Sequence, residues 1–408
     1  MKSSAKIFAL SALTLAASAA MAADVTLYGV VDTGLKYQHV DADMEGVDAV
    51  DSFTMDSGIV KGSRFGFKGT EELGNGLTVG FVLENGFNGD DGTLADSSRL
   101  FNRESQLFVR GAFGEVSFGR VGSLTSGNGT YGLAGNLSPF GTTWGDYAAN
   151  ASNVMSGFDR YDNTITYKSP NFAGVNVYAQ YSFDTNTKDD YNGKGLHGTE
   201  GKSSVDRYYA IGITYANGPL NLVGIVDSTN FSTLKWSSAT TGNPTNWGSD
   251  VEDAYTVTLG GSYDFNVVKF YLGAQYFDNA DLNSIDNVNI SDYTANPPHF
   301  QVKGYGIVTG VDVPLFGGTG KFAVGYVDGT IEKANGFDMA DLTHLWGEVD
   351  ISRWHVSAGY QYNLSKRTSV YGVASYSASS MDPNLKGPSN LDIDPSAVEC
   401  AVGLVHTF

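Results

Sequence analysis

The chain has 408 residues, with 25 basic and 44 acidic side chains, so its formal net charge is −19. This acidic balance disfavours a nucleic-acid partner, because phosphate binding needs a basic face. The composition includes 51 glycines and 23 each of tyrosine and phenylalanine, which is typical of two-faced strands with aromatic belts and not of a helical globule.

The first 22 residues have the three parts of a secretory signal peptide. Lys2 and Lys6 form the charged start, an apolar run covers 7–17, and a small-residue cleavage site lies at 20–22. The run is about eleven residues long, whereas a spanning helix needs roughly 20. We therefore expect a signal peptide over 1–22 and one domain over 23–408 that inserts into membranes by strands. An N-terminal membrane anchor is the alternative.

Residues 25–37 alternate strictly between two faces. Leu27 and Leu35 lie on one face, and Asp32 and Lys36 lie on the other. Because side chains alternate across a strand, this split is typical of lipid on one side and water on the other. The same period-two pattern recurs at 77–83, 175–183, 255–263, 268–276, 354–362 and 398–406. On the last of these strands, Cys400 is expected to face lipid.

The connections between these strands have two sizes, which alternate along the chain. Short, glycine- and asparagine-rich turns are predicted at 71–75, 111–114, 169–174, 217–218, 264–266, 314–318 and 363–366. Long polar connections are predicted at roughly 38–60, 87–104, 120–160, 184–205, 230–252, 279–300, 329–350 and 378–396.

Fifteen connections imply sixteen strands. Only helices and closed barrels satisfy every backbone group in lipid, and an even strand number puts both ends on one side, with short turns in the periplasm and long loops outside. A barrel of this size leaves an aqueous channel. The sequence therefore predicts an all-β, 16-stranded antiparallel transmembrane barrel in an outer membrane, with a pore.

Arg64 is the first candidate for the pore wall. It alternates with Phe65 and Phe67, so it points away from the lipid face. An arginine facing lipid at mid-depth would cost about 2–4 kcal/mol, which favours the lumen. Charged side chains in a narrow, water-filled pore bias which ions pass.

Seven segments, in order along the mature chain, carry a family resemblance. They are DVTLYGVVDTG (24–34), SRFGFKGTEELGNGL (63–77), FNRES (101–105), FGEVSFGR (113–120), RYDNTITYKSPNF (160–172), LSKRT (364–368) and VGLVHTF (402–408). Together they resemble the trimeric general porins of Gram-negative bacteria, of the beta-proteobacterial type. The resemblance implies a homotrimer of 16-stranded barrels whose third external loop, here about 121–159, folds inward to narrow the pore.

The resemblance also assigns residues. The implied basic wall opposite the loop consists of Arg64, Arg103, Arg120 and Arg160, with Lys68 and Arg110 as further candidates. The C-terminal Phe408 resembles the signal that the barrel-assembly machinery reads. The chain departs from the family at Val405 and Thr407, where arginine is common. Its third loop has only two acids, Asp146 and Asp159, and no basic residue, which argues against strong ion selectivity.

These observations predict a porin for passive diffusion of small hydrophilic solutes and ions, in contact with outer-membrane lipid and lipopolysaccharide. The arginines either form a field opposite Asp146 or pair with carboxylates such as Glu84 or Asp146. A sugar-specific porin is the alternative, because Tyr131 and Trp144 are rings that can stack on sugars; packing of the loop onto the wall is the competing role for them.

An enzyme is not expected, since the chain has no Gly-x-Ser-x-Gly, His-Glu-x-x-His or Cys-x-x-Cys motif. No cofactor is implied. The stretch 41–46 is similar to the start of a calcium loop, but its twelfth position is Ser52 instead of glutamate. We interpret this stretch as an acidic external loop and predict no metal site.

Overall fold

The computed structural model describes residues 24–43, 47–127, 129–188, 198–232, 252–281, 301–331, 347–385 and 394–408. The predicted signal peptide lies outside the described residues, as do parts of several long connections. Helical structure in the described ranges is limited to two 3-10 turns, η1 (Ala134–Asn136) and η2 (Ala151–Asn153). No helix of these ranges has the length and apolarity needed to cross a membrane.

The chain is otherwise built from antiparallel strands. Their bounds are β1 Asp24–Asp41, β2 Val50–Ser57, β3 Arg64–Gly74, β4 Leu77–Gly86, β5 Glu104–Gly111, β6 Gly114–Gly122, β7 Arg160–Lys168, β8 Val175–Ser182, β9 Arg207–Asn217, β10 Leu220–Asn230, β11 Ala254–Asp264, β12 Lys269–Asp281, β13 Gln301–Leu315, β14 Gly318–Ile331, β15 Gly347–Asn363, β16 Thr368–Leu385 and β17 Ser396–Thr407.

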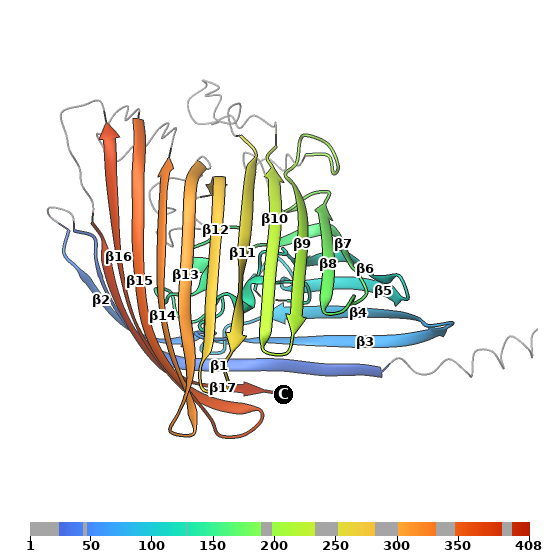
Figure 1. Ribbon diagram of the computed structural model, residues 1–408, viewed down its shortest axis with the longest axis horizontal. Helices are drawn as coiled ribbons and strands as arrows, with labels where there is room; N and C mark the ends of the chain where they lie inside the picture. Colours follow the sequence, from blue (N-terminus) through green and yellow to red (C-terminus); the bar gives the residue numbers. More distant parts are fainter. Residues whose placement is uncertain are drawn as a thin grey trace, which may run out of the picture.

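These strands form one closed barrel. From β3 to β17 each strand pairs with the next one along the chain, and β17 pairs with β1 to close the ring. β2 and β3 pair with the same edge of β1, at residues 33–40 and 24–30 respectively, so they share one position. The barrel therefore has sixteen positions, as predicted. Figure 1 shows β8 to β16 standing upright while β3 to β6 cross behind them.

A short interruption, residues 58–63, separates β2 from β3. Asp32 of β1 is fully buried there and accepts the backbone N–H groups of Val60 (2.8 Å) and Lys61 (2.7 Å). Tyr371 of β16 donates its hydroxyl to the same carboxylate at 2.7 Å. This contact ties the first strand, the interruption and the last hairpin together at the point of closure.

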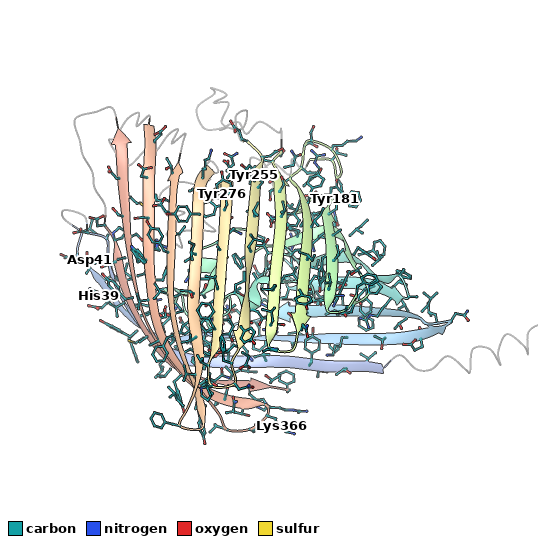
Figure 2. All side chains as sticks on the ribbon, in the orientation of Figure 1. His39, Asp41, Tyr181, Tyr255, Tyr276 and Lys366 are labelled. Carbon is teal, nitrogen blue, oxygen red and sulfur yellow. The ribbon has the colours of Figure 1, made fainter. Side chains whose placement is uncertain are left out.

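The alternation predicts the faces of the strands correctly. Leu27, Leu35, Val402 and Leu404 are exposed on the outside, whereas Asp32 and Glu399 are buried on the inside. Near the long connections, the outer face carries an aromatic belt in which Tyr181 contacts Tyr209, Tyr255 contacts Tyr276, and Tyr326 contacts Trp354. Figure 2 shows Tyr181, Tyr255 and Tyr276 at this end and Lys366 at the opposite end. Cys400 is exposed, as expected.

Each of the seven short turns lies at or next to its predicted position, but β3 continues to Gly74, through most of the turn predicted at 71–75. Several other strands are also longer than predicted. β1 continues to Asp41 and β2 begins at Val50, so the connection predicted at 38–60 shrinks to 42–49. β16 likewise runs to Leu385, beyond the predicted boundary at 378. These extensions are polar on the inner face, which makes them similar to loops in composition, although Phe53 and Met55 of β2 keep the alternation.

Candidate functional site

Four arginines converge on the inner wall of β3 to β7, and we call Arg64, Arg103, Arg120 and Arg160 the arginine cluster. Glu84 of β4 lies between the first two. Its Oε1 accepts a hydrogen bond from Arg103 Nε at 2.6 Å, and its Oε2 lies 3.5 Å from Arg64 Nε. Arg64 also donates to the carbonyl of Gly62 at 2.8 Å.

Arg120 reaches the cluster because its strand is irregular. Strict alternation from Glu115 would put Arg120 on the same outer face as Phe118. The pairing of β6 with β7 shifts after Gly119, whose φ is +130°, and such bulges re-aim side chains. Arg120 Nη1 consequently lies 2.6 Å from Asp162 Oδ1.

Asp162 joins the wall to the neighbouring connections. Besides Arg120, it binds Arg99 Nη1 at 2.8 Å and accepts from the backbone N–H of Thr187 at 2.9 Å. Arg99 therefore fastens the connection between β4 and β5 to β7. Sequence reasoning missed both residues, because neither the spacing nor the alternation links positions 63 residues apart.

Arg160 differs from its neighbours in its contacts. In the described part of the chain its guanidinium forms no hydrogen bond, but it interacts electrostatically with Arg103 and Arg120 and with the carboxylates of Glu84 and Glu104. With Arg99 included, five arginines face four carboxylates, Glu84, Asp96, Glu104 and Asp162, so this wall has a formal excess of one positive charge.

A polar cavity of about 290 Å³ opens beside the cluster, lined by Arg64, Lys68, Arg103, Glu84 and Glu104 together with Gly129 and Thr130. Lys68 lies with Nζ 5.1 Å from the ring centroid of Tyr28. Arg110 does not join this group. It lies at the short-turn end of β5, where its Nε binds Glu115 at 2.7 Å.

The segment 123–159, between β6 and β7, is fastened to much of the opposite wall. Thr125 donates to Asp227 of β10, the backbone N–H of Ser156 donates to Gln275 of β12 (2.6 Å), and the backbone N–H of Ala149 donates to Ser357 of β15 (2.8 Å). Lys321 of β14 donates to the carbonyl of Pro139 at 2.9 Å. The side chains that receive the segment all come from inner-facing strand positions.

Glycines on these strands make room for the segment. A Cβ on Gly273 would lie 2.8 Å from the Cβ of Leu137, and a Cβ on Gly306 would lie 1.5 Å from the carbonyl oxygen of Val154. Other positions in this glycine track also approach the segment closely, namely Gly212, Gly260, Gly310, Gly325 and Gly359. The segment thus fills space that side chains would otherwise occupy.

Asp146 lies away from the arginine cluster. Its Oδ2 is 2.6 Å from Lys36 Nζ and 2.7 Å from Gln38 Nε2, both on β1, and its backbone N–H donates to Glu399 of β17 at 3.0 Å. Lys36 also binds Asp56. Asp146 thus pairs with Lys36, a wall residue that the sequence analysis did not single out. For Asp159, the backbone carbonyl accepts from Ser123 at 2.9 Å.

The two aromatic residues of the sugar hypothesis are buried. Tyr131 donates its hydroxyl to Glu115 at 2.8 Å, and burial raises the pKa of this phenol above its ordinary range. Trp144 packs edge-on against Phe140 (5.6 Å) and against Tyr371 (5.8 Å). Both rings pack the segment onto the wall, which leaves neither face available to a sugar.

Phe408 closes the barrel seam. Its N–H donates to Gly29 O at 3.0 Å, its carbonyl accepts from Gly29 N at 3.1 Å, and its ring covers the space where Gly29 has no Cβ.

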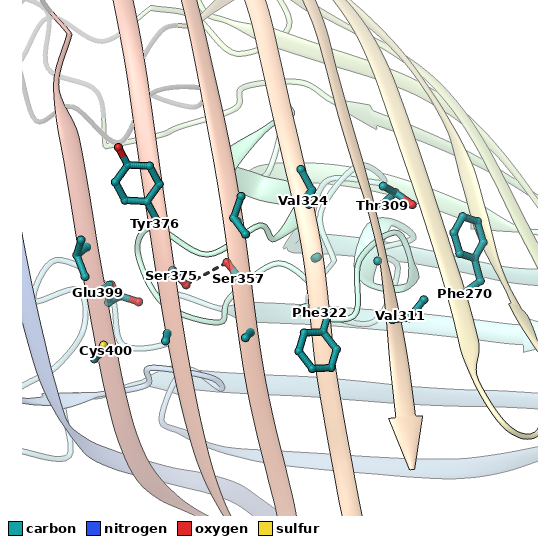
Figure 3. Close-up of a pocket in the computed structure, with 16 residues that line it drawn as sticks. Phe270, Thr309, Val311, Phe322, Val324, Ser357, Ser375, Tyr376, Glu399 and Cys400 are labelled. Atoms are coloured by element: carbon teal, nitrogen blue, oxygen red, sulfur yellow. Dashed lines mark hydrogen bonds between the residues drawn. The ribbon is translucent and has the colours of Figure 1, made fainter. Parts of the chain in front are cut away.

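A second hollow, of about 570 Å³, lies on β12 to β17 and contains Cys400 (Figure 3). Phe322, Val356 and Tyr376, which line it, are exposed on the outer face, whereas the Ser357–Ser375 hydrogen bond belongs to the inner face. The hollow is apolar and separate from the arginine cluster. Within the described ranges, no group of three His, Cys, Asp or Glu side chains is placed to hold a metal ion.

A family model described as Gram-negative porin matches residues 9–381. An outer membrane porin protein of Bordetella pertussis is 32% identical over 408 residues, covering 94% of each chain. Outer membrane porin protein 32 of Delftia acidovorans is 30% identical, covering 98% of this chain and 99% of the relative.

Solved structures give the same result. The anion-selective porin from Comamonas acidovorans matches with a TM-score of 0.63 and 26% identity, covering 95% of this chain and all of that one. The trimer form of OmpT, an outer membrane protein of Vibrio cholerae, matches with a TM-score of 0.53 at 17% identity and so supports the fold alone.

Proposed function

The chain belongs to the Gram-negative porin family and forms a channel in the outer membrane, and on this premise we propose that it passes small anions in preference to cations. Porins are channels and not enzymes, so solutes move down their own gradients. The arginine cluster is the selectivity element of this proposal, and the segment 123–159 is the inward-folded loop that narrows the pore.

The observation that carries the proposal is the excess of arginine over carboxylate on the wall of β3 to β7. Charged side chains that line a narrow aqueous passage select ions of opposite sign. Asp146 is bound by Lys36 of β1, the strand next to β3, and Lys36 also binds Asp56, so the proposal assigns selectivity to the arginine wall alone. The likeness to a porin described as anion-selective supports the same sign.

Arg64→Gln and Arg160→Gln test the proposal, because neither change removes a short ion pair to a carboxylate. The zero-current potential of the purified channel should move towards zero, with a fall in the chloride-to-potassium permeability ratio of about twofold for each charge. Arg367→Gln, in an exposed turn between β15 and β16, is the control and should behave as wild type. Unchanged selectivity in both wall variants would remove the arginine cluster from the proposal.

We extend the proposal to the assembly. A homotrimer is expected from the family resemblance, and OmpT has been solved in a trimer form. Contact of the long connections with lipopolysaccharide, and reading of Phe408 by the barrel-assembly machinery, belong to the same proposal. The position of Phe408 at the seam supports its recognition by the barrel-assembly machinery, since the terminal residue completes the last pairing of the barrel. Crosslinking of the native protein in outer membranes tests the trimer.

A further inference from the structure

The wall that holds the arginine cluster carries further cations towards the short-turn end, at two regular depths. Lys68 follows Arg64 by four residues on β3 and pairs across the sheet in one row with Val82 and Gln106. Arg110 follows Gln106 by four residues on β5. At about 3.3 Å per residue, each step is about 13 Å along the strands.

The row that contains Arg110, next to the short turns, brings together side chains from four strands. Arg110 of β5 pairs with Glu115 of β6, Glu115 pairs with Lys168 of β7, and Lys168 pairs with Tyr178 of β8. These positions face inward, because Phe118 and Ile165, which alternate with them, are exposed on the outer surface.

Charge compensation differs along this row. Glu115 uses one oxygen for Arg110 (2.7 Å) and the other for the Tyr131 hydroxyl (2.8 Å). Glu115 and Arg110 therefore compensate each other. Over the described ranges, the ammonium group of Lys168 forms no ion pair and no hydrogen bond, and the same holds for the ammonium group of Lys68.

Each of these two lysines instead lies against a tyrosine ring. The Nζ atom is 5.1 Å from the ring centroid of Tyr28 for Lys68, and 5.7 Å from that of Tyr178 for Lys168. A ring face holds an ammonium group without neutralising it. The lysine stem lies along the wall while the charged head stays in water, so its N–H donors remain open to a solute.

We propose that Lys68 and Lys168 are successive binding stations for small anionic solutes, carboxylates and phosphates, between the arginine cluster and the short-turn end. This inference rests on the proposed anion preference; it gives Lys68 a defined role and adds Lys168. The two stations are about 13 Å apart along the strands and also four strand positions apart across the sheet, at about 4.8 Å for each position. The Debye length is about 8 Å at physiological ionic strength, so the stations act one after the other. Several weak sites in series allow an anion both to enter and to leave, which conduction requires.

Inorganic phosphate is the probe for the test. Chloride current through the purified channel in a planar bilayer is measured while phosphate is added, for wild type, Lys68→Gln and Lys168→Gln. Phosphate should reduce the wild-type current, and the half-blocking concentration should rise about two- to fivefold in each variant, as expected for the loss of one weak site. Lys366→Gln, an exposed turn position, removes the same charge and should leave the block unchanged. Lys168→Arg keeps the positive charge and should therefore retain the wild-type half-blocking concentration.

The outcomes separate the two proposals. If wild type prefers anions but the half-blocking concentration is the same in wild type and both lysine variants, the stations are wrong and the anion preference stands. Absence of phosphate block in wild type also overturns the stations. A wild type that prefers cations removes the basis of both. Heat-modifiable migration in gel electrophoresis checks that every variant is a folded barrel before its current is compared with that of wild type.

Discussion

The hydroxyl of Tyr371 lies 2.7 Å from a carboxylate oxygen of Asp32, a residue 339 positions earlier in the chain. Tyr371 reaches Asp32 over Gly403 and Gly34, where a Cβ would lie 2.2 Å and 3.0 Å from the hydroxyl. One side chain therefore crosses β17 and joins β16 to β1 on the inside of the barrel. Because Asp32 also holds the interruption before β3, this pair stabilises the closure.

Tyr371→Phe should lower the stability of the barrel without preventing its assembly. The buried carboxylate loses one donor, and an unmet buried acceptor costs about 1–3 kcal/mol. The midpoint temperature of heat unfolding should fall. It is measured from the fraction of protein that still migrates on a gel as a folded barrel. Tyr376→Phe, on the exposed outer face, is the matched control. Equal midpoints for the two variants would show that the seam contact contributes nothing.

Lys321→Met should loosen the segment 123–159. Lys321 donates to the carbonyl of Pro139 and lies 5.4 Å from the ring centroid of Trp144, while pairing with Asp312 at 3.0 Å. Its loss removes a tether from the middle of the segment, so fluctuations of the open-channel current should increase.

Lys269→Met is the control for that change. Lys269 also lies against an aromatic ring, at 4.7 Å from Tyr271, but makes no contact with the segment among those described. Current noise that is equal in the two variants would argue that Lys321 does not restrain the segment.

Gly306→Ala should disturb the pore more than the small size of the added methyl group suggests. The added methyl would lie 1.5 Å from the carbonyl oxygen of Val154, so the segment must move. We expect a folded barrel with changed single-channel conductance. Gly372→Ala, where the nearest atoms are 3.7 Å away, should conduct as wild type. Wild-type conductance in Gly306→Ala would mean that the segment does not set the size of the pore.

The anion preference should weaken with salt. The Debye length shortens from about 10 Å at 0.1 M to about 3 Å at 1 M, so fixed charges on the wall then act over a smaller part of the passage. The permeability ratio, measured at fixed gradient and rising mean concentration, should decline towards unity. A ratio independent of salt would point to selection by close contacts instead of by the field of the wall.

Much of the fold could be predicted because alternation is a local property. The outer faces of strands such as 77–83 and 175–183 follow from period two, and the turns follow from Asn-Gly and similar pairs. The long connections were overestimated where polar inner-face residues continue the strand, as in β2. A strand that faces water inside a barrel is similar to a loop in composition.

The site was predictable in part. Family motifs located the four arginines, and Glu84 was named as a possible partner of them, whereas the pairing of Asp146 with Lys36 was not predicted. The contact of Asp146 with Lys36 joins residues 110 positions apart and depends on how the segment seats on the glycine track. A signal for that track was present, since Gly306 and Gly310 of the track lie four residues apart on one face of β13. Spacing alone could not say which segment fills the space.

The zero-current potential of the purified wild-type channel in a planar bilayer under a KCl gradient is the most direct test of the account. The excess of arginine over carboxylate on the wall predicts a potential with the sign of chloride permeation, and a smaller potential in Arg64→Gln and Arg160→Gln. A potential with the sign of potassium permeation would contradict the assignment of the arginine cluster as the selectivity element.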